Sequence, residues 1–249
     1  MSIPTLRADD KIVVVTGGSR GLGRAMALGF AEAGADVVVA SRKIVPSEAV
    51  ADEVRTLGRK AMAVTCHVGE WEQCEALVAA TVAEFGRIDV LINNAGIAPV
   101  PPSLRAVTSD LFDKTIAVNL KGPLRLTALA AEHMPAGGSV INISSTASLH
   151  PSPFTVVYAA AKAGQNAMTK AAAQELGPRG IRVNSIVCGT FYTDSLHQSL
   201  PTEALQSSMS GRVSLRRIAS ATEIVGTALF LASDASSYLN GELIVLDGG

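Results

Sequence analysis

Short apolar runs alternate with longer stretches of mixed polarity along most of the chain. Each run holds about five residues rich in valine and isoleucine, which is typical of strands buried on both faces of a sheet. The stretches between them repeat their apolar residues at helical spacing. The pattern predicts strands over residues 11–15, 36–40, 61–65, 89–92, 139–143, 181–187 and 242–246. Because strands that alternate with helices build a parallel sheet covered on both faces, we expect one α/β domain over residues 1–249.

Helices are predicted over residues 24–33, 47–58, 70–85, 109–134, 155–176 and 223–233. Residues 190–217 interrupt this rhythm, because they are polar and irregular over a length that loops rarely reach without a function. We expect this segment to form a lid that closes over bound ligands, with Phe191 and Tyr192 on its hinge side.

Composition and charge narrow the classes of function. Hydrophobic residues make up 48% of the chain and charged residues 17%, which predicts a large buried sheet and buried contacts between subunits. The net charge of −1 and the aromatic content of 4% argue against nucleic-acid binding. Cys66, Cys74 and Cys188 form neither a disulfide framework nor a metal-ligand pattern. No apolar run approaches the ~18 residues of a membrane span, so we expect a cytoplasmic protein without metal, membrane or nucleic-acid partners.

A glycine-rich turn joins the first predicted strand to the helix that follows it. Residues 16–23 read TGGSRGLG, and a second apolar strand comes after the helix. Glycines at such a turn let the backbone approach a pyrophosphate group, which binds the N–H groups at the helix start. This order of strand, turn, helix and strand is the context of a dinucleotide-binding site.

Tyr158 and Lys162 stand four residues apart on a predicted helix, so they share one face of it. A free phenol has a pKa of about 10, and a neighbouring ammonium group favours the phenolate. We therefore expect Lys162 to lower the pKa of Tyr158. Ser145, thirteen residues before the tyrosine, would hold a carbonyl or alcohol oxygen against the phenol. The three side chains predict proton transfer to or from the oxygen of a C–O group.

The spacing of Gly17, Gly21 and Gly23 departs from Gly-x-Gly-x-x-Gly and resembles that of the short-chain dehydrogenase/reductase family. The resemblance covers nearly the whole chain, with NNAG at residues 93–96 and DGG at residues 247–249. It implies a single-domain, Rossmann-type, doubly wound parallel sheet of about seven strands with helices on both faces. Reading the family's motifs onto this chain implies four catalytic residues: Asn119, Ser145, Tyr158 and Lys162.

The same resemblance implies a role for each catalytic residue. Tyr158 would be the general acid in reduction and the base in oxidation, and Ser145 would position the substrate oxygen. Lys162 would lower the pKa of the tyrosine and bind the nicotinamide ribose. Asn119 would sit at a kink in the long helix and hold a water molecule linked to the lysine.

The residues after the second predicted strand indicate which dinucleotide binds. An acidic residue there would favour NAD, but this chain has Ser41-Arg42-Lys43, and a guanidinium group suits the 2′-phosphate of NADP. We therefore expect NADP(H) to be preferred, with NAD(H) as the alternative. Together with the resemblance, the motifs predict these cofactor-binding residues: Gly17, Ser19, Arg20, Gly21, Leu22, Gly23, Ser41, Arg42, His67, Val68, Asn94, Ala95, Gly96, Tyr158, Lys162, Gly189, Phe191 and Thr193.

Several positions depart from the family pattern, and two of them lie at the expected cofactor site. His67 stands where an aspartate usually meets the adenine, and a neutral imidazole there would accept a hydrogen bond from the adenine amino group. Cys188 replaces the usual proline before Gly189 and is interpreted as a small packing residue. His150, Phe154, Phe191 and Tyr192 are candidates for lining the substrate pocket.

The leading hypothesis is an NADP-dependent carbonyl reductase or alcohol dehydrogenase. The alternatives are a 3-oxoacyl-carrier-protein reductase, with Arg179 as the candidate cation for docking the carrier, and an NAD-dependent sugar or polyol dehydrogenase. A non-catalytic nucleotide sensor is a further alternative, although such proteins usually lose the tyrosine or the lysine. The family pairs helices 109–134 and 155–176 across one two-fold axis and uses the last strand at a second axis, which implies a homotetramer of two-fold symmetry.

Overall fold

The computed structural model describes residues 6–193, 196 and 202–249. Within these residues seven parallel strands form one sheet in the order β3-β2-β1-β4-β5-β6-β7. This confirms the predicted doubly wound α/β fold. The strands are β1 (Ile12–Thr16), β2 (Asp36–Ser41), β3 (Ala61–Thr65), β4 (Val90–Asn93), β5 (Ser139–Ser145), β6 (Arg182–Cys188) and β7 (Leu243–Leu246).

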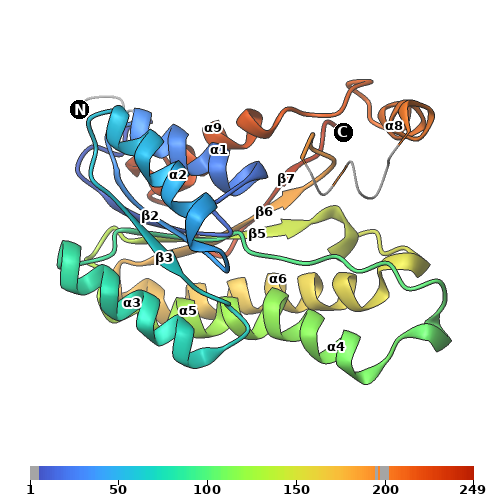
Figure 1. Ribbon diagram of the computed structural model, residues 1–249, viewed down its shortest axis with the longest axis horizontal. Helices are drawn as coiled ribbons and strands as arrows, with labels where there is room; N and C mark the ends of the chain where they lie inside the picture. The colour runs from blue at the N-terminus through green and yellow to red at the C-terminus, as the bar shows by residue number, and fades with distance from the viewer. Residues whose placement is uncertain (1–5, 194–195, 197–201) are drawn as a thin grey trace.

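Helices cover both faces of the sheet (Figure 1). One face carries α1 (Gly21–Glu32), α2 (Ile44–Thr56) and α9 (Ile224–Ala232). The opposite face carries α3 (Trp71–Phe85), α4 (Ser109–Ile116), α5 (Gly122–Ala131) and α6 (Val156–Leu176). Among the described residues, no helix combines the length and the apolar character needed to cross a membrane.

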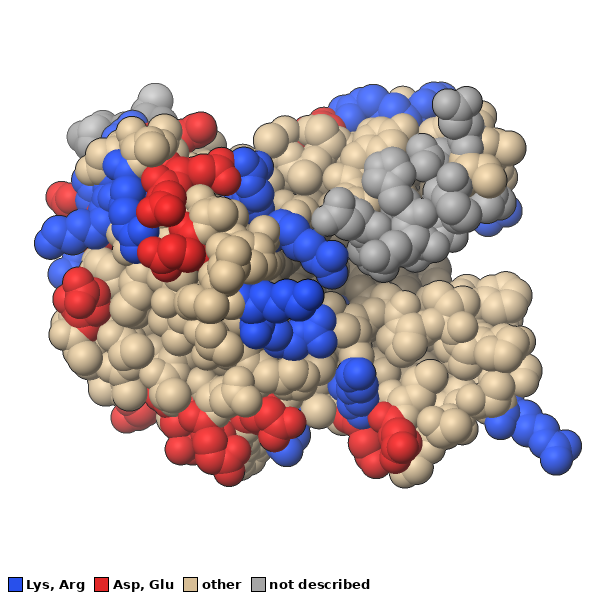
Figure 2. All heavy atoms as spheres, in the orientation of Figure 1, with Lys and Arg blue, Asp and Glu red and all other residues tan. Residues whose placement is uncertain are grey.

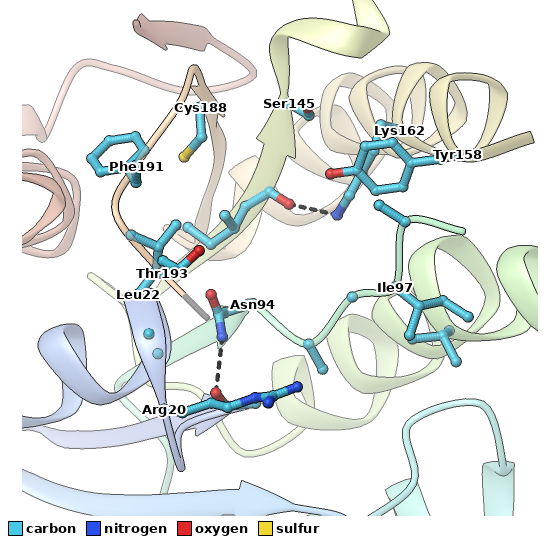
Figure 3. A pocket seen from close by; sticks show the side chains of 18 of the residues that line it. Arg20, Leu22, Asn94, Ile97, Ser145, Tyr158, Lys162, Cys188, Phe191 and Thr193 are labelled. Carbon is cyan, nitrogen blue, oxygen red and sulfur yellow. Dashed lines mark hydrogen bonds between the residues drawn. The ribbon is translucent and has the colours of Figure 1, made fainter. Parts of the chain in front are cut away.

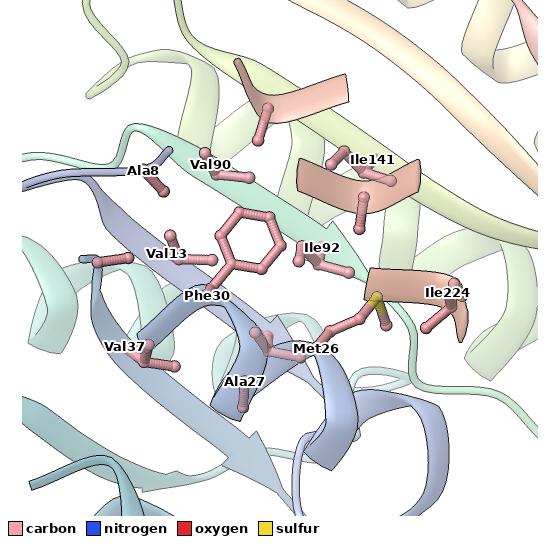
Figure 4. Packing of buried hydrophobic residues seen from close by; sticks show 14 of the residues in the cluster. Ala8, Val13, Met26, Ala27, Phe30, Val37, Val90, Ile92, Ile141 and Ile224 are labelled. Atoms are coloured by element: carbon pink, nitrogen blue, oxygen red, sulfur yellow. The ribbon is translucent and has the colours of Figure 1, made fainter. Parts of the chain in front are cut away.

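The core explains why the strands are apolar at every position rather than at every second one. Val13 and Val15 of β1 pack with Phe30 and Met26 of α1 on one face, whereas Val14 belongs to the cluster on the other face (Figure 4). Successive strand residues point to opposite faces, so a strand covered on both sides buries all of them.

The sheet order reverses beside β1, because β2 lies on one side of it and β4 on the other. In open α/β sheets this reversal leaves a crevice at the carboxyl ends of the strands, where ligands bind. The glycine turn after β1 and Asn94 after β4 both lie at this edge.

The long helix predicted over residues 109–134 is interrupted. Between α4 and α5 the chain makes a π-helical turn over Ala117–Lys121, and this turn contains Asn119. A π turn inserts one extra residue, which frees backbone carbonyls and bends the helix, and such turns are frequent at functional sites. The kink that the family resemblance implied at Asn119 is therefore present.

Part of the predicted lid can be described. Phe191 forms an isolated bridge with Ala219, and α8 (Glu203–Ser210) lies within the segment. Residues 194–195 and 197–201 of this prediction lie outside the described residues. Closure of the lid stays a prediction.

Candidate active site

A cavity of about 950 Å³ opens at the carboxyl ends of β1, β2, β4, β5 and β6. Figure 2 shows the molecule hollowed on this face, with Lys and Arg side chains along the edge of the hollow. All predicted site residues except Asn119 line this one cavity, although their segments are far apart in the sequence. Among the described residues, no group of three or more His, Cys, Asp or Glu side chains could hold a metal ion.

The glycine turn is shaped by close backbone contacts. A Cβ atom on Gly23 would lie 2.2 Å from the Gly17 carbonyl oxygen, so no larger residue fits there. Gly17 and Gly21 adopt positive φ angles of 64° and 54°, which favour glycine. The turn leads directly into α1, whose first N–H groups face the cavity and suit an anion.

Asn94 fastens this turn to the end of β4. Its amide nitrogen donates to the carbonyl oxygens of Thr16, at 2.8 Å, and Gly17, at 3.2 Å (Figure 3). The Thr16 hydroxyl oxygen in turn accepts from the backbone N–H groups of Asn94 and Ala95. Thr16 was not predicted as a site residue, and only its position beside the glycine turn signals its role. These bonds hold the glycine turn and the residues after β4 as one unit.

The side chains predicted to be catalytic come from β5 and α6. Tyr158 and Lys162 lie on one face of α6, and the Lys162 ammonium group lies 5.9 Å from the centre of the Tyr158 ring. Lys162 is 2% exposed, and its Nζ donates to the Ile143 carbonyl oxygen at 2.6 Å and to Gln165 Oε1 at 3.0 Å (Figure 3). Ser145, the last residue of β5, lines the same part of the cavity. The predicted trio is therefore brought together.

Burial dominates the electrostatics of this trio. It raises the pKa of Tyr158 to about 12, against a smaller opposing effect of the Ser145 hydroxyl. It also lowers the pKa of Lys162 to about 8. The pKa of the phenol is therefore raised rather than lowered as predicted, because loss of water outweighs any attraction of an ammonium group that donates to other acceptors.

Cys188 lies on β6 beside Lys162, and burial also dominates the electrostatics of its thiol. Burial raises the pKa of its thiol to about 12, with Lys162 opposing the rise. The thiol is protonated at neutral pH and packs as a small buried residue, as expected.

Asn119 is fully buried and does not line the cavity. Its amide nitrogen donates to the carbonyl oxygens of Ile97, at 2.8 Å, and Thr115, at 2.9 Å, and its Oδ1 accepts from the Ile97 N–H group. It thus satisfies a carbonyl at the π turn and binds the loop after β4 to the helix. Gly96 lies between it and Lys162, since a Cβ atom there would be 2.9 Å from Asn119 Oδ1 and 3.9 Å from Lys162 Nζ.

The end of the cavity that is predicted to bind adenosine is cationic. Arg20, Arg42 and Lys43 lie there, Lys114 and Lys162 are the other charged lining residues, and no described lining residue is an aspartate or a glutamate. Ser41 is turned toward its own loop, because its hydroxyl bonds to the Ser47 hydroxyl at 2.7 Å and to the Lys43 carbonyl oxygen at 3.1 Å. An anionic ligand suits this end.

His67 lines the cavity, but its predicted role as an acceptor is wrong. Its Nδ1 accepts a hydrogen bond from the Gly69 N–H group at 3.2 Å. A neutral imidazole that accepts at Nδ1 carries its proton on Nε2. The free ring nitrogen is therefore a donor, which suits a ring nitrogen of adenine rather than its amino group.

Three residues suggested for the substrate pocket lie elsewhere. Among the described residues, His150, Phe154 and Tyr192 are absent from the lining of this cavity, whereas Phe191 is part of it. His150 and Phe154 are exposed, and Tyr192 lines a neighbouring cavity of about 540 Å³. The sequence reasoning instead missed Thr146, Thr155, Thr190 and Met209, which line the cavity without belonging to any recognised motif.

Comparisons with known proteins agree with this site. The family model described as enoyl-(acyl carrier protein) reductase matches residues 17–249. The chain is 36% identical to the 3-oxoacyl-[acyl-carrier-protein] reductase FabG of Thermotoga maritima, covering 98% of this chain and 99% of that protein. It is 37% identical to an L-rhamnose 1-dehydrogenase (NAD(P)(+)) of Azotobacter vinelandii, covering 96% of each. The crystal structure of a short-chain type dehydrogenase/reductase from Mycobacterium marinum superposes with a TM-score of 0.91 at 34% identity, covering 98% of this chain and 96% of that one.

Proposed function

Because the chain belongs to the short-chain dehydrogenase/reductase family, whose members are NAD(P)-dependent oxidoreductases, we propose that it is an NADP-dependent enzyme interconverting a ketone and a secondary alcohol. The observation that carries the proposal is the single cavity that holds Ser145, Tyr158 and Lys162 at one end and a glycine turn with cations at the other. A dinucleotide spans such ends, and its nicotinamide supplies or accepts the hydride.

The residues present fit a dinucleotide. A Cβ atom would obstruct the backbone at Gly17 and Gly23, so this cradle needs glycine and leaves room for a pyrophosphate at the start of α1. At the adenosine end, Arg42 and Lys43 would hold the 2′-phosphate, and the absence of carboxylates from the described lining means that nothing there repels it. This supports NADP over NAD, which prefers an acidic residue at that place.

The proton step follows from the two shifted pKa values. With a pKa of about 12, Tyr158 carries its proton at neutral pH and is ready to donate it to a carbonyl oxygen held by Ser145. The charged form of Lys162 beside the ring would stabilise the phenolate that results. Asn119 would act at a distance, by holding the loop of Ile97 and Gly96 against Lys162.

The substrate end of the cavity favours an uncharged ligand. Thr146, Ala147, Thr155, Leu196 and Met209 line the cavity beside the trio, and most of these side chains are apolar or carry a hydroxyl group. Hydroxyl groups bind carbonyl or alcohol oxygens. We therefore propose a neutral ketone or secondary alcohol as the substrate class.

The carrier-protein alternative relies on Arg179 as its candidate docking cation. Arg179 follows the far end of α6, about 30 Å from Tyr158 at 1.5 Å per helical residue. It also forms an ion pair with Glu132 at 3.2 Å. Within one protomer Arg179 is therefore remote from this chain's own cavity, and its role in docking a carrier stays a prediction.

A homotetramer in the cytoplasm completes the proposal. Phe112 of α4 and Leu124 of α5 are 46% and 50% exposed, and Val245 of β7, at the edge of the sheet, is 48% exposed. Large apolar side chains that stay exposed on helix faces and at a sheet edge are typical of surfaces that another subunit covers. A tetramer of two-fold symmetry would cover both.

A panel of ketones and secondary alcohols, assayed with NADPH, NADH and their oxidised forms, tests the function. We expect turnover of neutral substrates with NADPH as the better reductant, and a sugar or polyol dehydrogenase would reveal itself by oxidation with NAD. Tight cofactor binding with no turnover of any member would favour the nucleotide sensor and contradict the proposal.

A further inference from the structure

Gln165 is a buried polar residue for which the mechanism so far has no use. It lies three residues after Lys162 on α6, on the same face of the helix, and is 0% exposed. Its Oε1 accepts from Lys162 Nζ at 3.0 Å, whereas its Nε2 has no hydrogen-bond partner among the described residues. A buried donor without a partner destabilises a fold, so stability does not explain a glutamine here.

Few groups face the Lys162 ammonium group. The Ile143 carbonyl oxygen of β5 accepts from it at 2.6 Å, and Tyr158 of α6 and Cys188 of β6 are the titratable groups beside it. Burial raises the pKa of both, so both are neutral at pH 7, and no carboxylate belongs to the described lining. Lys162 is therefore a buried cation without a described counter-ion, and Gln165 is the one described side chain that accepts a hydrogen bond from it.

We propose that Gln165 is a positioning residue for Lys162: its amide oxygen holds the ammonium group beside Tyr158 and keeps it charged. The proposal rests on the proposed function of this site. An ammonium group has three N–H donors, and with Ile143 and Gln165 occupying two of them one remains to point into the cavity. Without Gln165 the flexible lysine stem is held by one acceptor only.

The Gln165 amide oxygen acts on the pKa of Lys162 in a definite direction. An acceptor bonded to the charged form favours that form, so it raises the pKa of Lys162 against the lowering caused by burial. The pKa of about 8 is the balance of the two. Removing the acceptor should lower it by about one unit or more, since a hydrogen bond to a charged group is among the stronger ones. Half of the lysine would then be neutral near pH 7, where the charged form is needed.

The test replaces Gln165 by methionine, which has nearly the same volume and no amide. In the purified full-length enzyme, kcat/KM for the best ketone is measured between about pH 6 and 10. We expect the alkaline limb of Gln165→Met to move down by about one pH unit, which is a roughly tenfold loss near pH 9. The melting temperature serves to show that the variant folds: loss of the hydrogen bond to Lys162 destabilises the protein, and removal of the unpartnered Nε2 offsets part of this loss.

Thr169→Val is the matched control. Thr169 is buried one turn further along α6. Its hydroxyl accepts from Asn142 at 2.9 Å and donates to the backbone carbonyl oxygen of Gln165 at 2.9 Å, and it forms no described hydrogen bond with Lys162 or with the Gln165 side chain. It should lower the melting temperature and leave the alkaline limb in place. Should the methionine variant fail to fold, Gln165→Leu provides the same comparison.

A second measurement is independent of turnover. Competitive labelling with acetic anhydride, read by peptide mass spectrometry across pH, gives the pKa of Lys162 in the free enzyme. A lower midpoint in Gln165→Met than in the wild type and in Thr169→Val supports the proposal. Equal midpoints in all three proteins overturn it. If no carbonyl compound is turned over, the proposed function fails, while the labelling experiment still decides the role of Gln165.

Discussion

Replacing Arg42 by alanine isolates the interaction that would select NADP over NAD. Arg42 is exposed, lines the adenosine end of the cavity and forms no hydrogen bond or ion pair within the described residues. The hydroxyl of its neighbour Ser41 is hydrogen-bonded to the Ser47 hydroxyl and the Lys43 carbonyl oxygen, so it does not compete for a 2′-phosphate. The guanidinium group is therefore available, and its loss changes no described contact of the fold.

The size of the effect follows from the exposure of the site. A charge-assisted hydrogen bond contributes about 1.5–3 kcal/mol, and salt trims this at an open site, where the Debye length is about 10 Å at 0.1 M. Since about 1.4 kcal/mol is tenfold, Arg42→Ala should reduce kcat/KM for NADPH by roughly 10–100-fold. The same substitution should change kcat/KM for NADH, which lacks the 2′-phosphate, by no more than about threefold, which is less than the loss of one charge-assisted hydrogen bond.

The assay compares kcat/KM for NADPH and NADH in both proteins over a series of ionic strengths. The NADPH preference of the wild type should fall as salt is added, and that of the variant should change less. Arg55→Ala is the control, because Arg55 is a cation of α2 that pairs with Glu48 and Asp52 outside the cavity. A wild type that uses NADH as well as NADPH, or a variant with unchanged selectivity, would refute the reasoning.

Four further predictions follow from the same structure. Gly23→Ala should abolish cofactor binding measured by fluorescence titration, because its Cβ would lie 2.2 Å from a backbone oxygen. Gly226 lies on an open face of α9, so its matched variant Gly226→Ala should raise the free energy of unfolding in urea by roughly 0.5–1 kcal/mol. Tyr158→Phe should lose about 10²–10⁴-fold in kcat while cofactor still binds, and retention of more than about a tenth of the activity would remove the tyrosine from its role. Reduction by the wild type should decline as pH rises through about 8, since Lys162 loses its proton there; a rate that is flat to pH 10 would contradict this. Light scattering at micromolar concentration should give the mass of four chains, and a monomer would rule out the tetramer.

The sequence alone determines the features that depend on neighbours along the chain. Buried strands are visible as apolar runs because each strand is covered on both faces. The glycine turn is readable because Gly17 and Gly21 need positive φ angles, and Gly23 needs space, within a few residues of one another. Tyr158 and Lys162 share a face because four residues make about one helical turn. These local rules predicted the sheet and the glycine turn, and the family resemblance supplied much of the remaining cavity lining that was predicted.

Only the tertiary structure decided how the site residues interact. The pKa of Tyr158 rises rather than falls because α6, β5 and β6 together exclude water, and no local pattern reports burial. His67 became a donor through its bond to Gly69, and Arg179 proved remote because α6 carries it away from the site. Gln165 matters only because the fold buries it against Lys162 with no described counter-ion nearby. Hydrogen-bond partners and dielectric surroundings come from segments far apart in the chain, so they follow from packing and not from spacing.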